Sequence, residues 1–117
     1  MDISHLHLHV RDRERAVAFY RRWFGLAVVN RGEAMTFMQG GREFLLALMD
    51  DPAPAPMPPW FHFGILLDSR EAVATMLAAM TADGVSIAKA LHDSPTLVSF
   101  RCADPDGYVI EIYWATA

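Results

Sequence analysis

The sequence predicts an α+β protein made of two tandem copies of one strand–helix–strands unit. A strand pattern rich in histidine at residues 5–12 is followed by a helical pattern and a glycine, and the same order returns from residue 62. The tripeptide at 16–18, Ala-Val-Ala, also recurs at 72–74. These two observations indicate an internal duplication within one domain that spans residues 1–117.

The boundary between the copies is predicted by proline. Residues 50–59 hold five of the seven prolines, a composition typical of an extended and semi-rigid connector. The first module therefore covers about residues 1–50, the connector 51–59 and the second module about 60–117.

The first module opens with a strand whose two faces differ. Residues 3–10 alternate with period two, so the apolar face holds Leu6, Leu8 and Val10 and the other face holds His5, His7 and His9. Asp12 has the position of a helix N-cap, and Gly25 suits the end of that helix. Three further strands are predicted at 26–30, 35–39 and 44–49, separated by glycine turns.

The second module repeats this order with clearer helix signals. Residues 68–71 resemble a capping box with Asp68 in the capping place, and Gly84 ends the helix. Between them an apolar stripe with helical spacing predicts the buried face: Val73, Met76, Leu77 and Met80. Strands are predicted at 62–68, 85–89, 96–102 and 108–114. The turn at 104–107 separates the last two, and His92 lies in a predicted loop.

Composition excludes several classes of function. The 117 residues are 53% hydrophobic with a net charge of −4, which argues against disorder. Nine scattered arginines and one lysine form no basic stripe, so nucleic acid is not an expected partner. No apolar run approaches the ~20 residues of a membrane span, and no secretory signal is visible, so a cytoplasmic protein without membrane attachment is expected. The single cysteine, Cys102, excludes an internal disulfide.

Three residues at related places in the two modules are candidate metal ligands: His5, His62 and Glu111. The carboxylate of Glu111 lies in a strongly apolar run, where it needs a cation, a hydrogen-bond partner or solvent. Two imidazoles and one carboxylate suit Fe²⁺ or Mn²⁺, with Ni²⁺ or Zn²⁺ as further candidates, and leave coordination positions open. The alternative is that these are ordinary strand histidines and a partnered glutamate.

Other residues are expected near this site. His7 points to the same side as His5 and is a candidate acid–base residue, with a structural polar role as the alternative. His9 is expected to face solvent. By alternation, Trp60 shares the face of His62 and Tyr113 that of Glu111, so both are candidate substrate-binding residues, although packing is the commoner role for such side chains.

The duplicated unit, together with the segment from Asp104 to Glu111, Asp-Pro-Asp-Gly-Tyr-Val-Ile-Glu, resembles the vicinal oxygen chelate superfamily. This superfamily includes glyoxalase I, extradiol dioxygenases, fosfomycin-resistance enzymes and bleomycin-resistance proteins. The resemblance covers nearly the whole chain. It implies paired βαβββ modules forming a curled mixed sheet around a metal pocket, His5, His62 and Glu111 as the ligands, and a homodimer.

The resemblance leaves three functions open. Glyoxalase I uses a fourth ligand, a carboxylate, where this chain has Ala47 or a near neighbour, which favours a dioxygenase acting on a small substrate with vicinal oxygens. The first alternative is a lyase of the glyoxalase type. The second is a metal-free protein that binds a drug or metabolite, as bleomycin-resistance proteins do.

Overall fold

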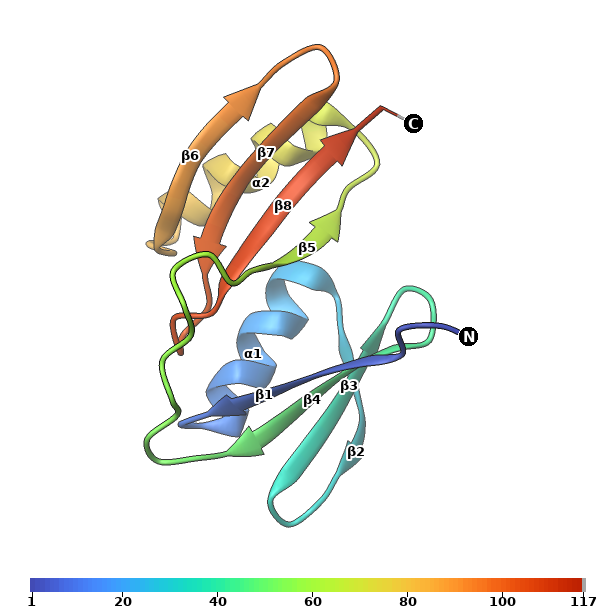
Figure 1. The fold of residues 1–117 in the computed structure, drawn as a ribbon, viewed down its shortest axis with the longest axis vertical. Coiled ribbons are helices and arrows are strands. Elements are labelled where there is room, and N and C mark those ends of the chain that lie inside the picture. Colours follow the sequence, from blue (N-terminus) through green and yellow to red (C-terminus); the bar gives the residue numbers. More distant parts are fainter. Residues whose placement is uncertain (117) are drawn as a thin grey trace. The chain divides into compact units, whose positions relative to one another are not determined.

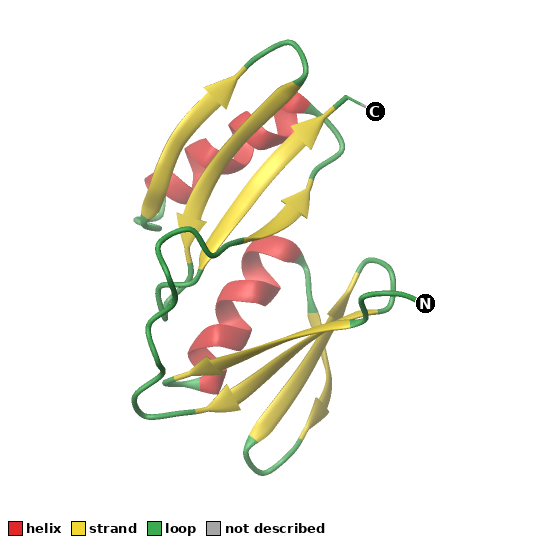
Figure 2. Cartoon of the chain, in the orientation of Figure 1, coloured by secondary structure: helices red, strands yellow, loops and turns green. Residues whose placement is uncertain are grey.

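The computed structural model describes residues 1–116 and divides the chain into two compact units, Met1–Pro56 and Met57–Ala117. Each unit contains one strand, one helix and then three strands, as Figure 1 shows. Figure 2 shows the connector between the units as a loop, and the stretch from Asp51 to His62 contains neither helix nor strand.

The first unit is a four-stranded mixed sheet with one helix. Its elements are β1 (His5–Val10), α1 (Arg13–Phe24), β2 (Ala27–Arg31), β3 (Met35–Gly40) and β4 (Phe44–Asp50). The strand order is β1-β4-β3-β2, with β1 parallel to β4 and the other pairs antiparallel. Helix α1 packs against β3 and β4, and the buried residues of the unit include Leu8, Val10, Tyr20, Met38 and Leu48.

The second unit repeats this topology. Its elements are β5 (Phe63–Leu66), α2 (Arg70–Ala82), β6 (Ile87–Asp93), β7 (Leu97–Ala103) and β8 (Val109–Ala115). The strand order is β5-β8-β7-β6, and β5 runs parallel to β8. Helix α2 packs against β7 and β8, and the buried residues include Val73, Met80, Phe100, Ile110 and Ile112.

The α+β class and the two βαβββ modules are therefore confirmed. The sheet differs from the expectation in one respect, because each module builds its own open four-stranded sheet and neither sheet closes on itself. No helix in residues 1–116 is both long enough and apolar enough to cross a membrane.

The structure tests the predicted capping residues at the ends of the two helices. The Asp12 side chain accepts a hydrogen bond from Arg15 N at 3.1 Å, and Gly25 ends α1 with φ of +68°, both as predicted. The cap predicted for α2 is wrong by one residue. Ser69 caps this helix by accepting from Ala72 N at 3.1 Å, and Asp68 does not, because the helix begins at Arg70.

Two strand boundaries also differ from the prediction. Strand β6 begins later than predicted and continues to Asp93, so His92 lies in the strand and pairs with Ser99. The tight turn that joins β6 to β7 needs only the residues from Ser94 to Thr96, which leaves His92 free to join the ladder. Strand β5 begins at Phe63, immediately after His62, and Trp60 lies in a turn.

The first residue of each helix is an arginine that fastens the turn between the second and third strands of its unit. In the first unit, Arg13 donates to the carbonyl oxygens of Gly32 at 2.9 Å and Glu33 at 2.6 Å. Its Nε lies 2.8 Å from the Asp50 carboxylate on β4. One guanidinium therefore ties α1 to the β2–β3 turn and to the end of β4.

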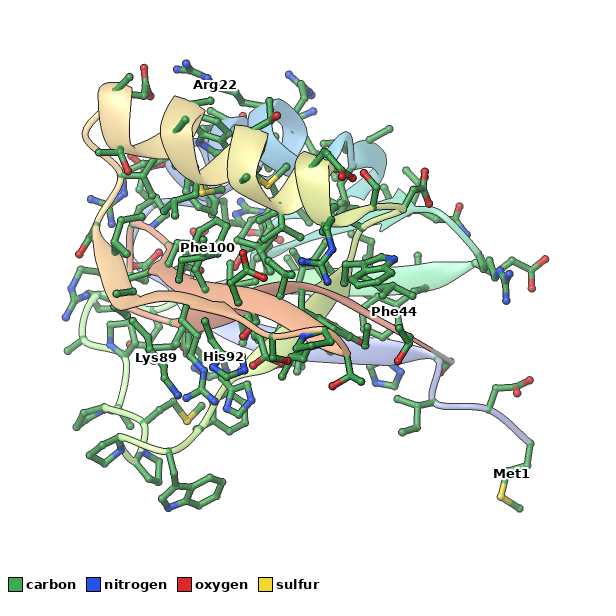
Figure 3. All side chains as sticks on the ribbon, turned by 90° about the horizontal axis from the view of Figure 1, so that it is seen from above. Met1, Arg22, Phe44, Lys89, His92 and Phe100 are labelled. Carbon is green, nitrogen blue, oxygen red and sulfur yellow. The ribbon has the colours of Figure 1, made fainter. Side chains whose placement is uncertain are left out.

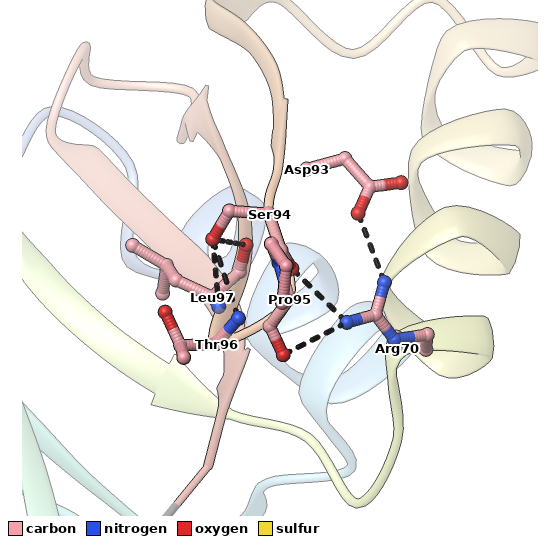
Figure 4. Close-up of polar contacts among 6 residues, drawn as sticks. All are labelled: Arg70, Asp93, Ser94, Pro95, Thr96 and Leu97. Atoms are coloured by element: carbon pink, nitrogen blue, oxygen red, sulfur yellow. Dashed lines mark hydrogen bonds and ion pairs between the residues drawn. The ribbon is translucent and has the colours of Figure 1, made fainter.

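Arg70 does the same in the second unit, as Figure 4 shows. Its guanidinium donates to the Asp93 carboxylate at 2.9 Å and to the Ser94 carbonyl oxygen at 3.0 Å. The Ser94 hydroxyl closes the same turn by accepting from Leu97 N at 3.1 Å. Arg70 also lies over the Trp114 ring, 5.0 Å from its centre.

Replacing Arg13 by lysine should destabilise the protein by about 1–3 kcal/mol. Lysine keeps the charge beside Asp50 but lacks the planar group that reaches two carbonyl oxygens at once, and hydrogen bonds from charged groups contribute at this level. Chemical denaturation of Arg13→Lys would measure the loss. Arg42→Lys is the matched control, since Arg42 is exposed, and an equal effect in both variants would contradict the role assigned to Arg13.

Candidate functional site

The histidines of β1 lie on the face of the first sheet that α1 does not cover. Leu8 and Val10 are fully buried, whereas His5 and His7 are exposed and His9 is half-buried, which confirms the predicted two-faced strand. The His5 ring has one close polar contact, between its Nδ1 and the Ser4 hydroxyl at 3.0 Å.

His7 and His9 are joined in a short hydrogen-bonded chain. Their Nε2 atoms lie 3.1 Å apart, and His9 Nδ1 lies 2.9 Å from the Asp51 carboxylate at the end of β4. The hydrogen bond from His9 holds the pKa of the Asp51 carboxyl below its usual value, and a backbone hydrogen bond from Ala53 adds to this. His9 was expected only to face solvent, so its acidic partner was not predicted.

His62 is held in one tautomer by the backbone. Its Nδ1 lies 3.0 Å from the Trp60 carbonyl oxygen, which can only accept a hydrogen bond. Nδ1 therefore carries the proton, and the lone pair of the neutral ring is on Nε2. Histidine ligands of metals usually donate the N–H of their second nitrogen to a carbonyl or carboxylate, and His62 has this hydrogen-bonding arrangement.

Glu111 lies on β8, the strand that pairs with β5. Gly64 of β5 pairs with Glu111, whereas His62 precedes the first residue of β5, so the strand ladder does not determine the direction of its side chain. The Glu111 side chain is only one quarter exposed. The carboxylate is thus in the partly buried position where a cationic partner is most valuable.

The structure provides one such cationic partner that the sequence reasoning missed. Arg101 of β7 pairs with Glu111 across the β7–β8 hairpin, and its guanidinium lies 3.8 Å from the carboxylate. The contact is long for an ion pair, and the buried Nε of Arg101 has no hydrogen-bond partner. Pairing the residues on either side of the predicted turn at 104–107 would have placed Arg101 opposite Glu111.

The same face continues into β6 with further basic side chains. Lys89 pairs with Arg101, and His92 pairs with Ser99. Figure 3 shows Lys89 and His92 on the side of the sheet away from α2. Glu111 therefore stands at one end of a row whose other members are basic.

Tyr113 shares the face of Glu111, as predicted, and it depends on a glycine. A Cβ atom added to Gly64 would lie 3.1 Å from the Tyr113 ring, so a side chain at this position would require the ring to move by a few tenths of an ångström. Trp60 is different. Its side chain is 72% exposed, and because it precedes the strand in a turn, alternation along β5 does not determine its direction.

The turn before β8 determines where the strand that carries Glu111 begins. The buried carboxylate of Asp104 accepts hydrogen bonds from Asp106 N and Tyr108 N, each at 2.9 Å, and Gly107 adopts φ of +87°. The same carboxylate, together with burial as the larger cause, raises the pKa of the Cys102 thiol to about 12. Cys102 is therefore not a thiolate nucleophile near neutral pH.

The cysteine can be tested directly. Because Cys102 is buried and its thiol remains protonated, a thiol reagent such as Ellman's reagent should label the native protein slowly and the denatured protein at once. The chain has a single cysteine, so the absorbance change reports this residue alone. Rapid and complete labelling of the folded protein would contradict the assignment.

The predicted ligands are thus distributed over both units, with His5 on β1 in the first and His62 and Glu111 in the second. Within residues 1–116, no group of three or more His, Cys, Asp or Glu side chains is arranged to hold a metal ion. The fit to a metal therefore depends on the single residues, chiefly the tautomer of His62 and the partly buried carboxylate of Glu111.

The sequence matches a known protein family over most of its length. Residues 2–112 match the model of the Glyoxalase/Bleomycin resistance protein/Dioxygenase superfamily. An uncharacterized protein of Pseudomonas aeruginosa is 32% identical, and the match covers 93% of this chain and 85% of that protein. A catechol-2,3-dioxygenase of Bacillus subtilis is 28% identical, and the match covers 95% of this chain but only 40% of the dioxygenase.

Solved structures show the same relationship. The structure of a possible glyoxalase from Bacillus cereus superposes with a TM-score of 0.81 at 30% identity, covering 96% of this chain and 97% of that protein.

Proposed function

Because the chain belongs to the glyoxalase, bleomycin resistance protein and dioxygenase superfamily, we propose that it is a divalent-metal-dependent enzyme. Its substrate is a small molecule with two neighbouring oxygen atoms, and its chemistry is of the dioxygenase type. The observation that carries this proposal is the hydrogen bond from His62 Nδ1 to the Trp60 carbonyl oxygen, which keeps the Nε2 lone pair ready for a metal.

His5, His62 and Glu111 are the proposed ligands. Fe²⁺ or Mn²⁺ suits two imidazoles and one carboxylate best, and Ni²⁺ or Zn²⁺ also accepts this set. When bound, the metal supplies a Lewis acid that stabilises negative charge on substrate oxygen, or a place for dioxygen beside the substrate. The protein would work as a homodimer.

Arg101 and Lys89 have a proposed role in orienting the substrate. Once the Glu111 carboxylate serves as a ligand, the partly exposed guanidinium of Arg101 is left beside it, and its Nη2 is 3.8 Å from the carboxylate. An oxyanion of the substrate is the natural partner for the outer nitrogens of this group, because it would keep the local charge balanced. Tyr113 supplies an aromatic surface on the same face, and Trp60 is the second proposed substrate-binding residue.

His7 is the proposed acid–base group. Its ring is exposed on the face of His5 and exchanges a hydrogen bond with His9, so it can hold or release a proton beside a substrate. The structural alternative is that His7 only completes the polar chain to Asp51.

Dioxygenase chemistry is favoured over lyase chemistry by the position of Ala47. This buried alanine pairs with His7 across the β1–β4 ladder, where a carboxylate would be needed for a four-ligand glyoxalase site. The similarity to a catechol-2,3-dioxygenase supports the same choice. The similarity to a possible glyoxalase supports the lyase alternative. A metal-free binding protein is the third candidate.

Metal content distinguishes an enzyme from a binding protein. The wild type, purified without oxygen, should carry close to one Fe or Mn per chain, and His62→Ala and Glu111→Ala should lose it because each variant removes a ligand. His92→Ala is the matched control, since it removes an exposed strand histidine outside the set. A wild type that takes up no metal after reconstitution would reject the proposal in favour of ligand binding.

The reaction class is tested with substrates. The loaded protein should consume oxygen with catechols and leave a thiol hemithioacetal unchanged, measured with an oxygen electrode and by absorbance. His7→Gln should keep the metal and lower turnover roughly 10²-fold or more, the usual contribution of an acid–base group. Isomerisation of the hemithioacetal without oxygen uptake would transfer the assignment to the lyase.

A further inference from the structure

A second place on the first unit has the geometry of a metal site, and it uses none of the three proposed ligands. His7 and His9 stand two positions apart on β1, so their side chains leave the same face of the strand. Their rings are 5.1 Å apart between centres, and their Nε2 atoms converge to 3.1 Å. Both rings are accessible to solvent.

The separation of these nitrogens matches that of two ligands on one ion. Bonds from a metal to imidazole nitrogen are about 2.0–2.1 Å long. Two such bonds at angles between square and tetrahedral hold their nitrogens about 2.9–3.4 Å apart. The observed 3.1 Å lies within this range, so one ion can bind both nitrogens once each ring tilts its Nε2 lone pair toward it.

Asp51 prepares one of the two rings for this role. A carboxylate can only accept a hydrogen bond, so His9 Nδ1, which lies 2.9 Å from it, must carry the proton. The lone pair of neutral His9 is therefore on Nε2, which faces His7. A carboxylate bonded to the far nitrogen of a histidine ligand is the usual outer support of a metal site, and it raises the basicity of the ligand.

We infer that His7 and His9 form a two-histidine site for a divalent transition metal, with Asp51 as its outer partner and water completing the coordination. Two imidazoles on an exposed strand do not impose a particular coordination geometry on the ion. The affinity of the site for different metals therefore follows the general order, in which Cu²⁺ binds most tightly among first-row divalent ions. An ion on this pair occupies Nε2 of His7 and removes that residue from proton transfer, so the proposed acid–base role and metal binding exclude each other.

Copper titration of the full-length, chelator-stripped His62→Gln variant tests the site, because this background leaves the proposed catalytic set a single imidazole, and the variants below are made in it. We expect one Cu²⁺ centre whose pulsed electron paramagnetic resonance shows two imidazole ligands. His7→Gln and His9→Gln should each weaken binding by about tenfold or more, because loss of an outer partner alone typically costs 10–100-fold. Asp51→Asn should weaken it less, since the amide oxygen still accepts from His9 Nδ1. Buried Cys102 does not compete for the ion.

Two further variants separate this site from the proposed catalytic one. Adding His92→Gln to His62→Gln should leave the two-imidazole signal and its affinity unchanged, and His9→Gln alone should leave iron loading of the proposed catalytic ligands unchanged. Because His7 is exposed, His7→Gln should fold like the wild type, which circular dichroism would verify. A two-imidazole signal that is absent from His62→Gln, or one that persists when His7→Gln or His9→Gln is added to it, would overturn the inference.

Discussion

Parallel pairing of the first and last strand of each module is the constraint on which the candidate chemistry depends. Strands β5 and β8 can pair in parallel only because α2, β6 and β7 intervene and return the chain to the same sheet. This pairing sets Gly64 opposite Glu111, and His62 stands two residues before Gly64 in the chain. A register shift of one residue would turn Glu111 into the apolar layer under α2, where an unpaired carboxylate is costly.

The duplicated arginines show how such a register is maintained. Arg13 and Arg70 each begin a helix and each hold the turn between the two strands that follow it. Each also pairs with an aspartate at the end of a strand, Asp50 in the first unit and Asp93 in the second. The two modules therefore share more than their order of elements, because the same charged group in the same place fixes the helix against the sheet in both.

The sequence predicted what depends on near neighbours and missed what depends on pairing across strands. Alternation in β1, the Asp12 cap and the turn before Tyr108 are local, and all three were correct. Arg101 beside Glu111 and Asp51 beside His9 join residues whose proximity follows only from strand register. The cap at Ser69 and the longer β6 have another cause. Adjacent polar residues can each mark the boundary of a helix or strand, and the packing of the whole unit decides which of them does.

Tautomers connect these observations to function. A histidine ligand needs an acceptor for its second nitrogen, and this chain supplies a backbone carbonyl to His62 and a carboxylate to His9. The carbonyl is neutral, so it fixes the ring without adding charge to a site that already has Glu111. The carboxylate of Asp51 adds negative charge beside His7 and His9, which have no acidic ligand of their own. In both places the acceptor is therefore matched to the charge that the neighbouring side chains leave unbalanced.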